Sequence, residues 1–373
     1  MHFETLAVHA GGEPDPDTGA VSPPIHLATT FVHGPECEPL FTHAYQREGN
    51  PTQDRLETAL AALEGGEAAL AFASGMAATA TFLESLPAGT TVAFHRDVYS
   101  GVRSLATDFL PRWGMHALFV DLGDRAELAK AFAAGTTWLW AESPTNPQLE
   151  ILDLARLAVD AHAAGARLLV DGTFATPALQ RPLALGADVV LHSTTKYISG
   201  HSDVLGGALV FARRDGDYEA VASARRRLGG TASPFSSWLV LRGLRSLACR
   251  MERHSANALA VSRGLAGHPA LADVVYPGLE AHPGHEIARR QMRAYGGMIA
   301  LRVAGGRKGA VGVASRLKLF LNATSLGGPE SLVEHRASSD GPGTTTPEDL
   351  LRLSIGLEHP DDLLADLRQA LDR

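Results

Sequence analysis

The chain has 373 residues, 45% hydrophobic and 20% charged, which is typical of a globular protein with a sizeable core. A net charge of −8 and the lack of a Lys/Arg tract indicate that nucleic acid is not a partner. The sequence shows no signal peptide and no apolar run near the ~20 residues of a membrane span, so we expect a cytoplasmic protein without membrane contact. Its two cysteines lack the spacing of a metal site, and we expect no metal.

The first half of the sequence predicts an α/β fold. Residues 1–50 are rich in proline, glycine and polar residues, and we expect an extended arm; residues 53–63 follow with helical periodicity and a stop at Gly65-Gly66. Short apolar runs then alternate with mostly helical segments: 68–73, 91–94, 117–120, 137–141, 167–170, 187–191 and 207–211. Continuous apolar strands separated by helices favour a mainly parallel, seven-stranded sheet covered on both faces.

The pattern changes near residues 229–234, where we place a domain boundary. A long helical stretch over 238–265 comes first, mixed strands such as 297–303 follow, and a helix begins near Pro360. The sequence thus predicts an arm (1–50), a large domain (51–232) and a smaller α+β domain (233–373).

Polar or aromatic side chains follow several predicted strands, at the edge where open parallel sheets bind ligands. Ser74-Gly75-Met76 opens a helix and suits an anion, although a plain helix cap explains Ser74 equally well. Tyr99 could stack on an aromatic cofactor or be a half-buried loop residue. Asn146, between two prolines, could present its amide to a ligand or belong to a simple turn.

The last two strand ends carry an acid and a lysine. Asp171 closes a buried strand and needs a partner, either a pyridinium N–H or the N-terminus of the next helix. Lys196 follows Ser193, Thr194 and Thr195; alone, such a segment is more often a surface loop, but a lysine beside a phosphate-bearing aldehyde can form a Schiff base. An anion site, an aromatic ring, an amide, an acid and a lysine at successive strand ends together predict a site for pyridoxal phosphate.

On these and other segments the sequence resembles the Cys/Met-metabolism family of pyridoxal-phosphate enzymes, the cystathionine γ-synthase and γ-lyase group. The resemblance covers nearly the whole chain and rests on seven segments: 45–52, 74–76, 142–147, 171–177, 192–203, 325–332 and 351–358. It implies an aspartate-aminotransferase-like fold of type I, pyridoxal 5′-phosphate as cofactor, and a homo-oligomer, usually a dimer of dimers.

The resemblance also implies roles for individual residues. The implied catalytic residues are Lys196, as Schiff-base lysine and proton shuttle, and Tyr99, which also stacks on the cofactor ring; Asp171 pairs with the ring nitrogen. Further cofactor-binding residues are Ser74, Gly75, Met76, Asn146, Thr173, Ser193 and Thr195, with Tyr45 and Arg47 reaching the phosphate from a neighbouring subunit. The implied substrate-binding residues are Arg352, as clamp for the α-carboxylate, with Asn146, Ser325 and Leu326 beside it.

The implied chemistry is removal of the α-proton by Lys196, loss of a β-proton and departure of the γ-substituent. Our leading hypothesis is a carbon–sulfur lyase that performs α,γ-elimination, similar to cystathionine γ-lyase, and releases a keto acid, ammonia and a thiol. Replacement on an activated homoserine, as in cystathionine γ-synthase, and methionine γ-lyase activity are the alternatives. A silent homologue would lack Lys196 or Asp171, and a dinucleotide enzyme would need a G-x-G-x-x-G motif that is absent here.

Departures from the family pattern concern the substrate. Members that handle cystathionine often have acidic residues where this chain has Ala44 and Thr324, and an arginine for the distal carboxylate where it has Ser104. Arg103 lies one position earlier and leaves open whether it substitutes. Methionine γ-lyases commonly have a cysteine where this chain has Gly101. The sequence therefore predicts the cofactor more sharply than the substrate.

Overall fold

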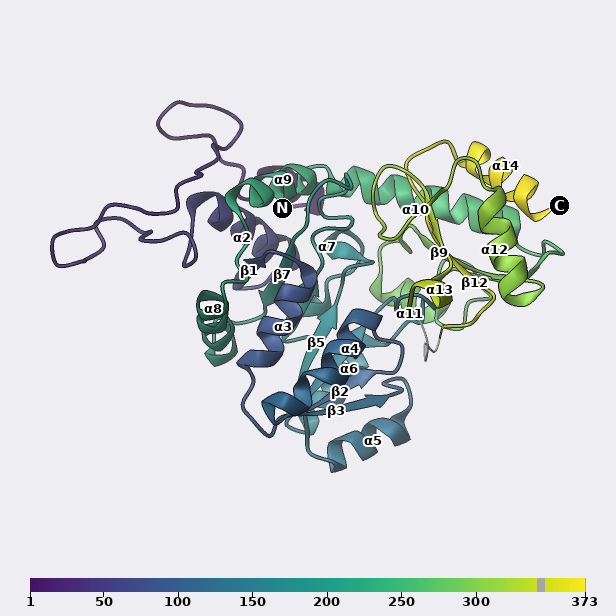
Figure 1. Cartoon of the computed structure of the whole chain (residues 1–373), viewed down its shortest axis with the longest axis horizontal. Coiled ribbons are helices and arrows are strands. Elements are labelled where there is room, and N and C mark those ends of the chain that lie inside the picture. The colour runs from purple at the N-terminus through teal and green to yellow at the C-terminus, as the bar shows by residue number, and fades with distance from the viewer. Residues whose placement is uncertain (341–345, 373) are drawn as a thin grey trace.

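The computed structural model describes residues 1–340 and 346–372, so the predicted domain 233–373 includes residues outside the described ones. Its largest layer is a seven-stranded sheet in the order β1-β7-β6-β5-β4-β2-β3 (Figure 1). The strands are β1 (Ala68–Phe72), β2 (Thr91–His95), β3 (His116–Val120), β4 (Thr136–Glu142), β5 (Arg167–Asp171), β6 (Val189–His192) and β7 (Gly207–Phe211). Only β7 pairs antiparallel with its neighbours, β1 and β6. The mainly parallel sheet predicted from the apolar runs is confirmed.

Helices cover both faces of this sheet because successive strand residues point to opposite sides. In β4, Trp138 and Trp140 pack edge-on against Phe82, whereas Leu139 and Ala141 belong to a separate core cluster. The first face is covered by α3 (Gly75–Ser85), α4 (Ser100–Asp108) and α8 (Gly216–Leu228). The second is covered by α2 (Pro51–Glu64), α5 (Arg125–Ala133), α6 (Leu154–Ala163) and α9 (Pro234–Leu244). The sheet is thus buried between two layers of helices.

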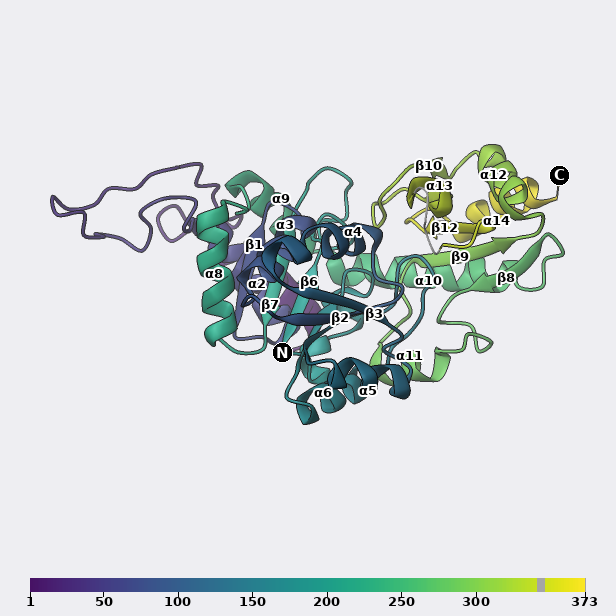
Figure 2. The same cartoon turned by 60° about the horizontal axis from the view of Figure 1, so that its bottom comes forward.

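The N-terminal segment differs in part from the expected extended arm. A short helix, α1 (Phe3–His9), buries Phe3 and Ala7, which lie one turn apart and face the core. Most of residues 10–50 runs as irregular chain and extends away from the body of the molecule (Figure 2). The helix predicted over 53–63 is α2: Asn50 caps its start by accepting from Thr52 N at 2.9 Å, and Gly65 ends it with φ of 78°.

The C-terminal part forms a second sheet in the order β10-β11-β12-β9-β8. Its strands are β8 (Leu271–Val275), β9 (Met298–Val303), β10 (Leu321–Asn322), β11 (Leu332–Glu334) and β12 (Leu350–Ser354). The remaining helices are α7 (Thr176–Leu179), α10 (Leu247–Leu265), α11 (His285–Gln291), α12 (Gly306–Arg316), α13 (Arg336–Asp340) and α14 (Pro360–Leu371). The helical stretch expected over 238–265 is broken between α9 and α10, and α9 packs on α2 while α10 contacts the second sheet.

Two features are absent from the described residues, 1–340 and 346–372. None of their helices is long and apolar enough to cross a membrane. They also contain no group of three or more His, Cys, Asp or Glu residues arranged to hold a metal ion.

Candidate active site

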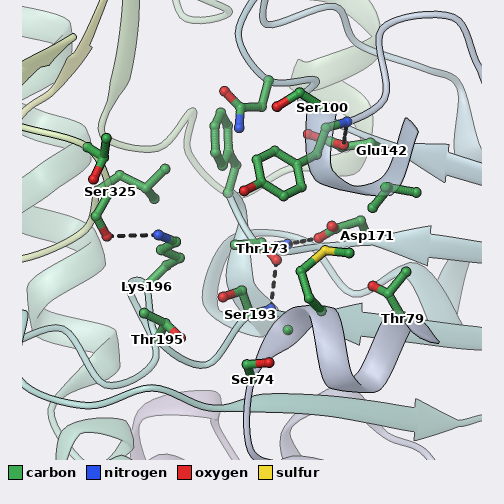
Figure 3. A pocket seen from close by; sticks show the side chains of 18 of the residues that line it. Ser74, Thr79, Ser100, Glu142, Asp171, Thr173, Ser193, Thr195, Lys196 and Ser325 are labelled. Atoms are coloured by element: carbon green, nitrogen blue, oxygen red, sulfur yellow. Dashed lines mark hydrogen bonds between the residues drawn. The ribbon is translucent and has the colours of Figure 1, made fainter. Parts of the chain in front are cut away.

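A cavity of about 590 Å³ lies where the ends of β4, β5 and β6 meet residues of the second sheet (Figure 3). It brings together thirteen of the fifteen residues singled out from the sequence: Ser74, Gly75, Met76, Tyr99, Asn146, Asp171, Thr173, Ser193, Thr195, Lys196, Ser325, Leu326 and Arg352. The two others, Tyr45 and Arg47, do not line it. Residues separated by up to 278 positions thus converge on one space, because strands of the first sheet end at one edge and residues of the second sheet lie against that edge.

The amine of Lys196 projects into this cavity from the turn after β6. Its Nζ donates a hydrogen bond to Oγ of Ser325 at 2.8 Å, which links the end of the large sheet to the second domain (Figure 3). Burial, with the nearby charge of Arg352, lowers the pKa of Lys196 to about 8. At pH 7 about a tenth of this amine is therefore neutral and nucleophilic, far more than for a lysine with the ordinary pKa of 10.5.

The start of α3 forms an anion-binding corner. Oγ of Ser74 caps the helix by accepting from Ala77 N at 3.0 Å, and Ala78 N bonds to Ser74 O. The N–H groups of Gly75 and Met76 precede the first intrahelical bonds and are available to an anion. A Cβ at Gly75 would lie 3.0 Å from Cβ of Ser193, so a side chain there would fill the corner. This geometry fits a phosphate group.

Two further backbone contacts shape the cavity wall beside that corner. Ser193 N donates to Oγ1 of Thr173 at 2.9 Å, so the turns after β5 and β6 are joined. The hydroxyl of Thr195 donates to Gly206 O at 3.1 Å and accepts from Gly206 N at 3.0 Å. Thr195 thus fixes the loop that follows Lys196, in addition to facing the cavity.

The acidic residues lie at the ends of β4 and β5. Asp171 accepts from Thr173 N at 2.9 Å, and burial raises the pKa of its carboxyl. Glu142 accepts from Tyr99 N at 2.9 Å and so holds the backbone that presents the tyrosine ring. Burial and the nearby Asp171 raise the pKa of Glu142 well above its usual range. A cationic N–H opposite Asp171, such as a pyridinium, would relieve this penalty.

Arg352, on β12, is buried on the opposite wall. Its Nη1 donates to Oδ1 of Asn146 at 2.9 Å, and its Nη2 donates to Ser325 O at 3.0 Å and pairs with Glu334. Ser325 presents this carbonyl from the left-handed region, with φ of 82°. The planar guanidinium is therefore locked in one orientation, which suits bidentate capture of a carboxylate.

Sequence reasoning missed four charged residues of the cavity: Glu142, described above, and Glu334, Arg336 and Asp340. Arg336 donates to Glu334 at 3.2 Å and pairs with Asp340, so acids and guanidinium groups alternate along this wall from Arg352 onward. The sequence signal for this wall is a short apolar run, Leu332-Val333, that is followed by a glutamate and, two residues later, an arginine.

The position of Arg103 bears on whether it could replace the arginine expected at Ser104 for the distal carboxylate. Its guanidinium stacks over the ring of Phe119 at 4.2 Å and bonds to the carbonyl of Arg96. Arg103 does not line the cavity and is directed away from it. A Cβ at Gly101 would lie 2.6 Å from Cε1 of Tyr99, so a side chain there would require the tyrosine ring to shift.

Tyr45 and Arg47 lie on the exposed arm. Nη1 of Arg47 donates to Arg226 O at 2.5 Å, and its guanidinium lies 5.4 Å from the Tyr45 ring centroid. Neither contacts the cavity of its own chain, so their action on the site of a neighbouring subunit stays a prediction.

Comparison with known proteins finds relatives that all belong to one enzyme family. Residues 4–372 match the family described as Cys/Met metabolism PLP-dependent enzyme. A cystathionine gamma-synthase of Mycobacterium tuberculosis is 48% identical over 98% of this chain and 96% of its own length. A cystathionine gamma-lyase of Bacillus subtilis is 41% identical over 100% of both chains. The crystal structure of metB from Corynebacterium glutamicum matches with a TM-score of 0.96 and 43% identity over 100% of this chain and 98% of that one.

Proposed function

The chain belongs to the Cys/Met metabolism PLP-dependent enzyme family, and within it we propose γ-replacement: exchange of the γ-substituent of an activated homoserine for a thiol. Pyridoxal phosphate is the cofactor of this family, and the fold is the one its solved members share. The assignment to replacement draws support from the synthase of Mycobacterium tuberculosis, the relative with the higher identity of the two compared above.

The cavity offers a partner for each part of the cofactor. The N–H groups of Gly75 and Met76, with Ser193, would hold the phosphate, Asp171 the ring nitrogen and Tyr99 the ring face. When bound, pyridoxal phosphate supplies an electron sink that stabilises the negative charge left by proton removal. The protein provides the rest: orientation, exclusion of water and proton transfer.

The position of the Lys196 amine carries the part of the proposal that replacement and elimination share, namely removal of the α-proton. Nζ of Lys196 bonds to the hydroxyl of Ser325, and the carbonyl of Ser325 bonds to Arg352. A substrate whose carboxylate binds Arg352 would therefore present its α-carbon to this amine. With a pKa of about 8, the amine can accept the α-proton and return it at a neighbouring carbon.

Elimination by a carbon–sulfur lyase is the second candidate, and the sequence alone ranked it first. The relative of Bacillus subtilis named cystathionine gamma-lyase favours it. Both reactions need the same Lys196 and Arg352, and both proceed to departure of the γ-substituent. They differ in what happens to the unsaturated compound left after this departure. In replacement a thiol adds to it, and in elimination water releases it as a keto acid and ammonia.

Product analysis on the purified holoenzyme separates the two. The substrates are O-acetyl- and O-succinyl-homoserine with and without cysteine, and cystathionine and methionine alone. We expect thioether formation to exceed keto-acid release by at least about tenfold when cysteine is present. Predominant keto acid and ammonia from cystathionine would instead identify a lyase. Failure to turn over any of these compounds would contradict both functions.

A further inference from the structure

A second buried guanidinium, that of Arg336, lines the active-site cavity. Its side chain is 9% exposed, and Nη2 donates to Oγ of Ser100 at 3.2 Å. Ser100 directly follows Tyr99 and also lines the cavity. Arg336 therefore reaches from the Arg352 wall to the side of the cavity that carries the tyrosine, and none of the roles assigned above uses it.

The charges around Arg336 hold it in place. Oε1 of Glu334 accepts from Arg336 and Oε2 of the same carboxylate pairs with Arg352, so the two guanidinium groups share one acid. Asp340 pairs with Arg336 from the last residue of α13. A buried arginine fixed in this way loses little freedom when an anion binds.

Arg336 retains capacity for an anion. Its contact with Ser100 is to a neutral hydroxyl, which a carboxylate would replace with a stronger, charge-assisted bond. In addition, its buried Nε has no hydrogen-bond partner within residues 1–340 and 346–372. A buried donor without a partner is unfavourable, and a small rearrangement around a bound carboxylate could satisfy it.

The location of Arg336 indicates which substrate group it meets. Ser100 and Ser104 lie one turn apart on α4 and so share a face of the helix. Ser104 is the position where an arginine for the distal carboxylate was expected, and Arg103 is directed away toward Phe119. Arg336 reaches this face of α4 from a different element, α13.

We propose that Arg336 binds the carboxylate at the far end of the reacting compound and thereby selects dicarboxylate substrates. This inference rests on the proposed function and deepens it. The α-carboxylate would bind Arg352, and the second carboxylate would bind Arg336. Two sources offer this chemistry in γ-replacement: a dicarboxylic half-ester of homoserine, such as the succinyl ester, and the carboxylate of the incoming cysteine.

The test compares Arg336→Met holoenzyme with wild type on matched pairs of compounds. One arm uses O-succinyl- against O-acetyl-homoserine with a fixed thiol, and the other uses cysteine against cysteamine with a fixed ester. We expect kcat/KM for the carboxylate-bearing member of one pair to fall about 10- to 100-fold more than for its partner. The arm that shows the difference identifies the source of the carboxylate. Arg336→Lys retains the charge but not the paired donors of the guanidinium, and its kcat/KM for the carboxylate-bearing compound should fall less than that of Arg336→Met.

Arg103→Met is the matched control, because Arg103 is a nearby arginine outside the cavity, and it should leave both ratios unchanged. Equal losses on all four compounds, or none, would overturn the proposal. A titration of the holoenzyme with cystathionine and with methionine, followed by the cofactor's visible absorbance, gives a Kd for each compound and tests the same contact by binding alone. Selective weakening of cystathionine binding in Arg336→Met would support the proposal even if γ-replacement is not the reaction, whereas equal Kd ratios would oppose it.

Discussion

Arg352 donates a hydrogen bond to the side chain of Asn146 across 2.9 Å, although 206 residues separate them in the sequence. Arg352 belongs to a strand of the second sheet, and Asn146 follows β4 of the first. Both side chains are buried. The expected binding site for the α-carboxylate therefore exists only when the two sheets are docked, and its geometry depends on contacts made by both.

Replacing Arg352 with lysine should weaken binding of every amino-acid substrate. Lysine keeps the charge but cannot bond to Asn146, Ser325 O and a carboxylate in one plane. We expect KM to rise about 10- to 100-fold for acetyl and succinyl esters alike, in contrast to the selective effect of Arg336→Met. Arg302→Lys on the adjacent strand β9, where the arginine pairs with Asp349, is the control. An unchanged KM in Arg352→Lys would refute this role.

Lys196→Ala should abolish both the attachment of the cofactor and catalysis. The amine is the group of the cavity suited to form a Schiff base with the cofactor aldehyde, because burial lowers its pKa to about 8 and so raises the fraction that is neutral. We expect loss of the visible absorbance of lysine-bound pyridoxal phosphate and a fall in kcat of about 1,000-fold or more. Lys308→Ala, at an exposed position of α12, should behave as wild type. Turnover at the wild-type rate in Lys196→Ala would disprove the assignment.

The lowered pKa of Lys196 predicts a pH profile for cofactor capture by the apoprotein. Only the neutral amine attacks an aldehyde, so the rate should rise with pH and level off above a midpoint near 8, rather than above the ordinary value of 10.5. Stopped-flow absorbance measures this midpoint. Because Arg352 contributes to the lowering, Arg352→Gln should move the midpoint upward. A midpoint above 10 in the wild-type protein would contradict the prediction.

The same shift affects stability with a defined sign. The pKa of Lys196 is lower in the folded apoprotein than in the unfolded chain, so the unfolded state binds more protons between about pH 8 and 10.5. The contribution of Lys196 to the free energy of unfolding should therefore rise with pH across this window. Comparing urea unfolding of the wild-type apoprotein and Lys196→Met at several pH values isolates that contribution, and parallel profiles would argue against it.

The sequence predicted the sheet and most of the cavity for a physical reason. Buried strands need continuous apolar residues, so runs such as Leu168–Val170 and Val189–Leu191 are visible without any tertiary information. Polar residues directly after such runs must lie at the sheet edge. Asp171 and Lys196 are therefore predicted to lie at the same edge of the sheet, and both line the cavity.

What the sequence could not predict depends on docking between distant segments. The wall formed by Glu334 and Arg336 lies at the end of β11, a strand of only three residues. Its place in the site depends on the contacts of Glu334 with Arg352 and of Arg336 with Ser100. The break between α9 and α10 also follows tertiary packing, because α9 lies on α2 and α10 on the second sheet. Helical periodicity does not encode which layer a helix covers.

The arm provides a prediction about assembly. It carries Tyr45 and Arg47 away from the cavity of their own chain and exposes several large apolar side chains, including Val21, Leu27, Val32 and Phe41. Exposed apolar residues gathered on one segment are typical of an interaction surface. We therefore expect the arm to pack on a second copy of the chain and to place Arg47 at the cofactor phosphate of that copy.

Subunit complementation tests this arrangement. Lys196→Ala and Arg47→Ala should each be nearly inactive alone, but a symmetric mixed dimer would contain one site with both wild-type residues. Co-expression of equal amounts should therefore restore about a quarter of the wild-type activity. The control pairs Lys196→Ala with Asp171→Asn, whose wild-type counterparts line the same cavity of one chain, so mixing should restore nothing. If the first pair also gives no recovery although mixed dimers are isolated by differential tags, then Arg47 does not act on a neighbouring site.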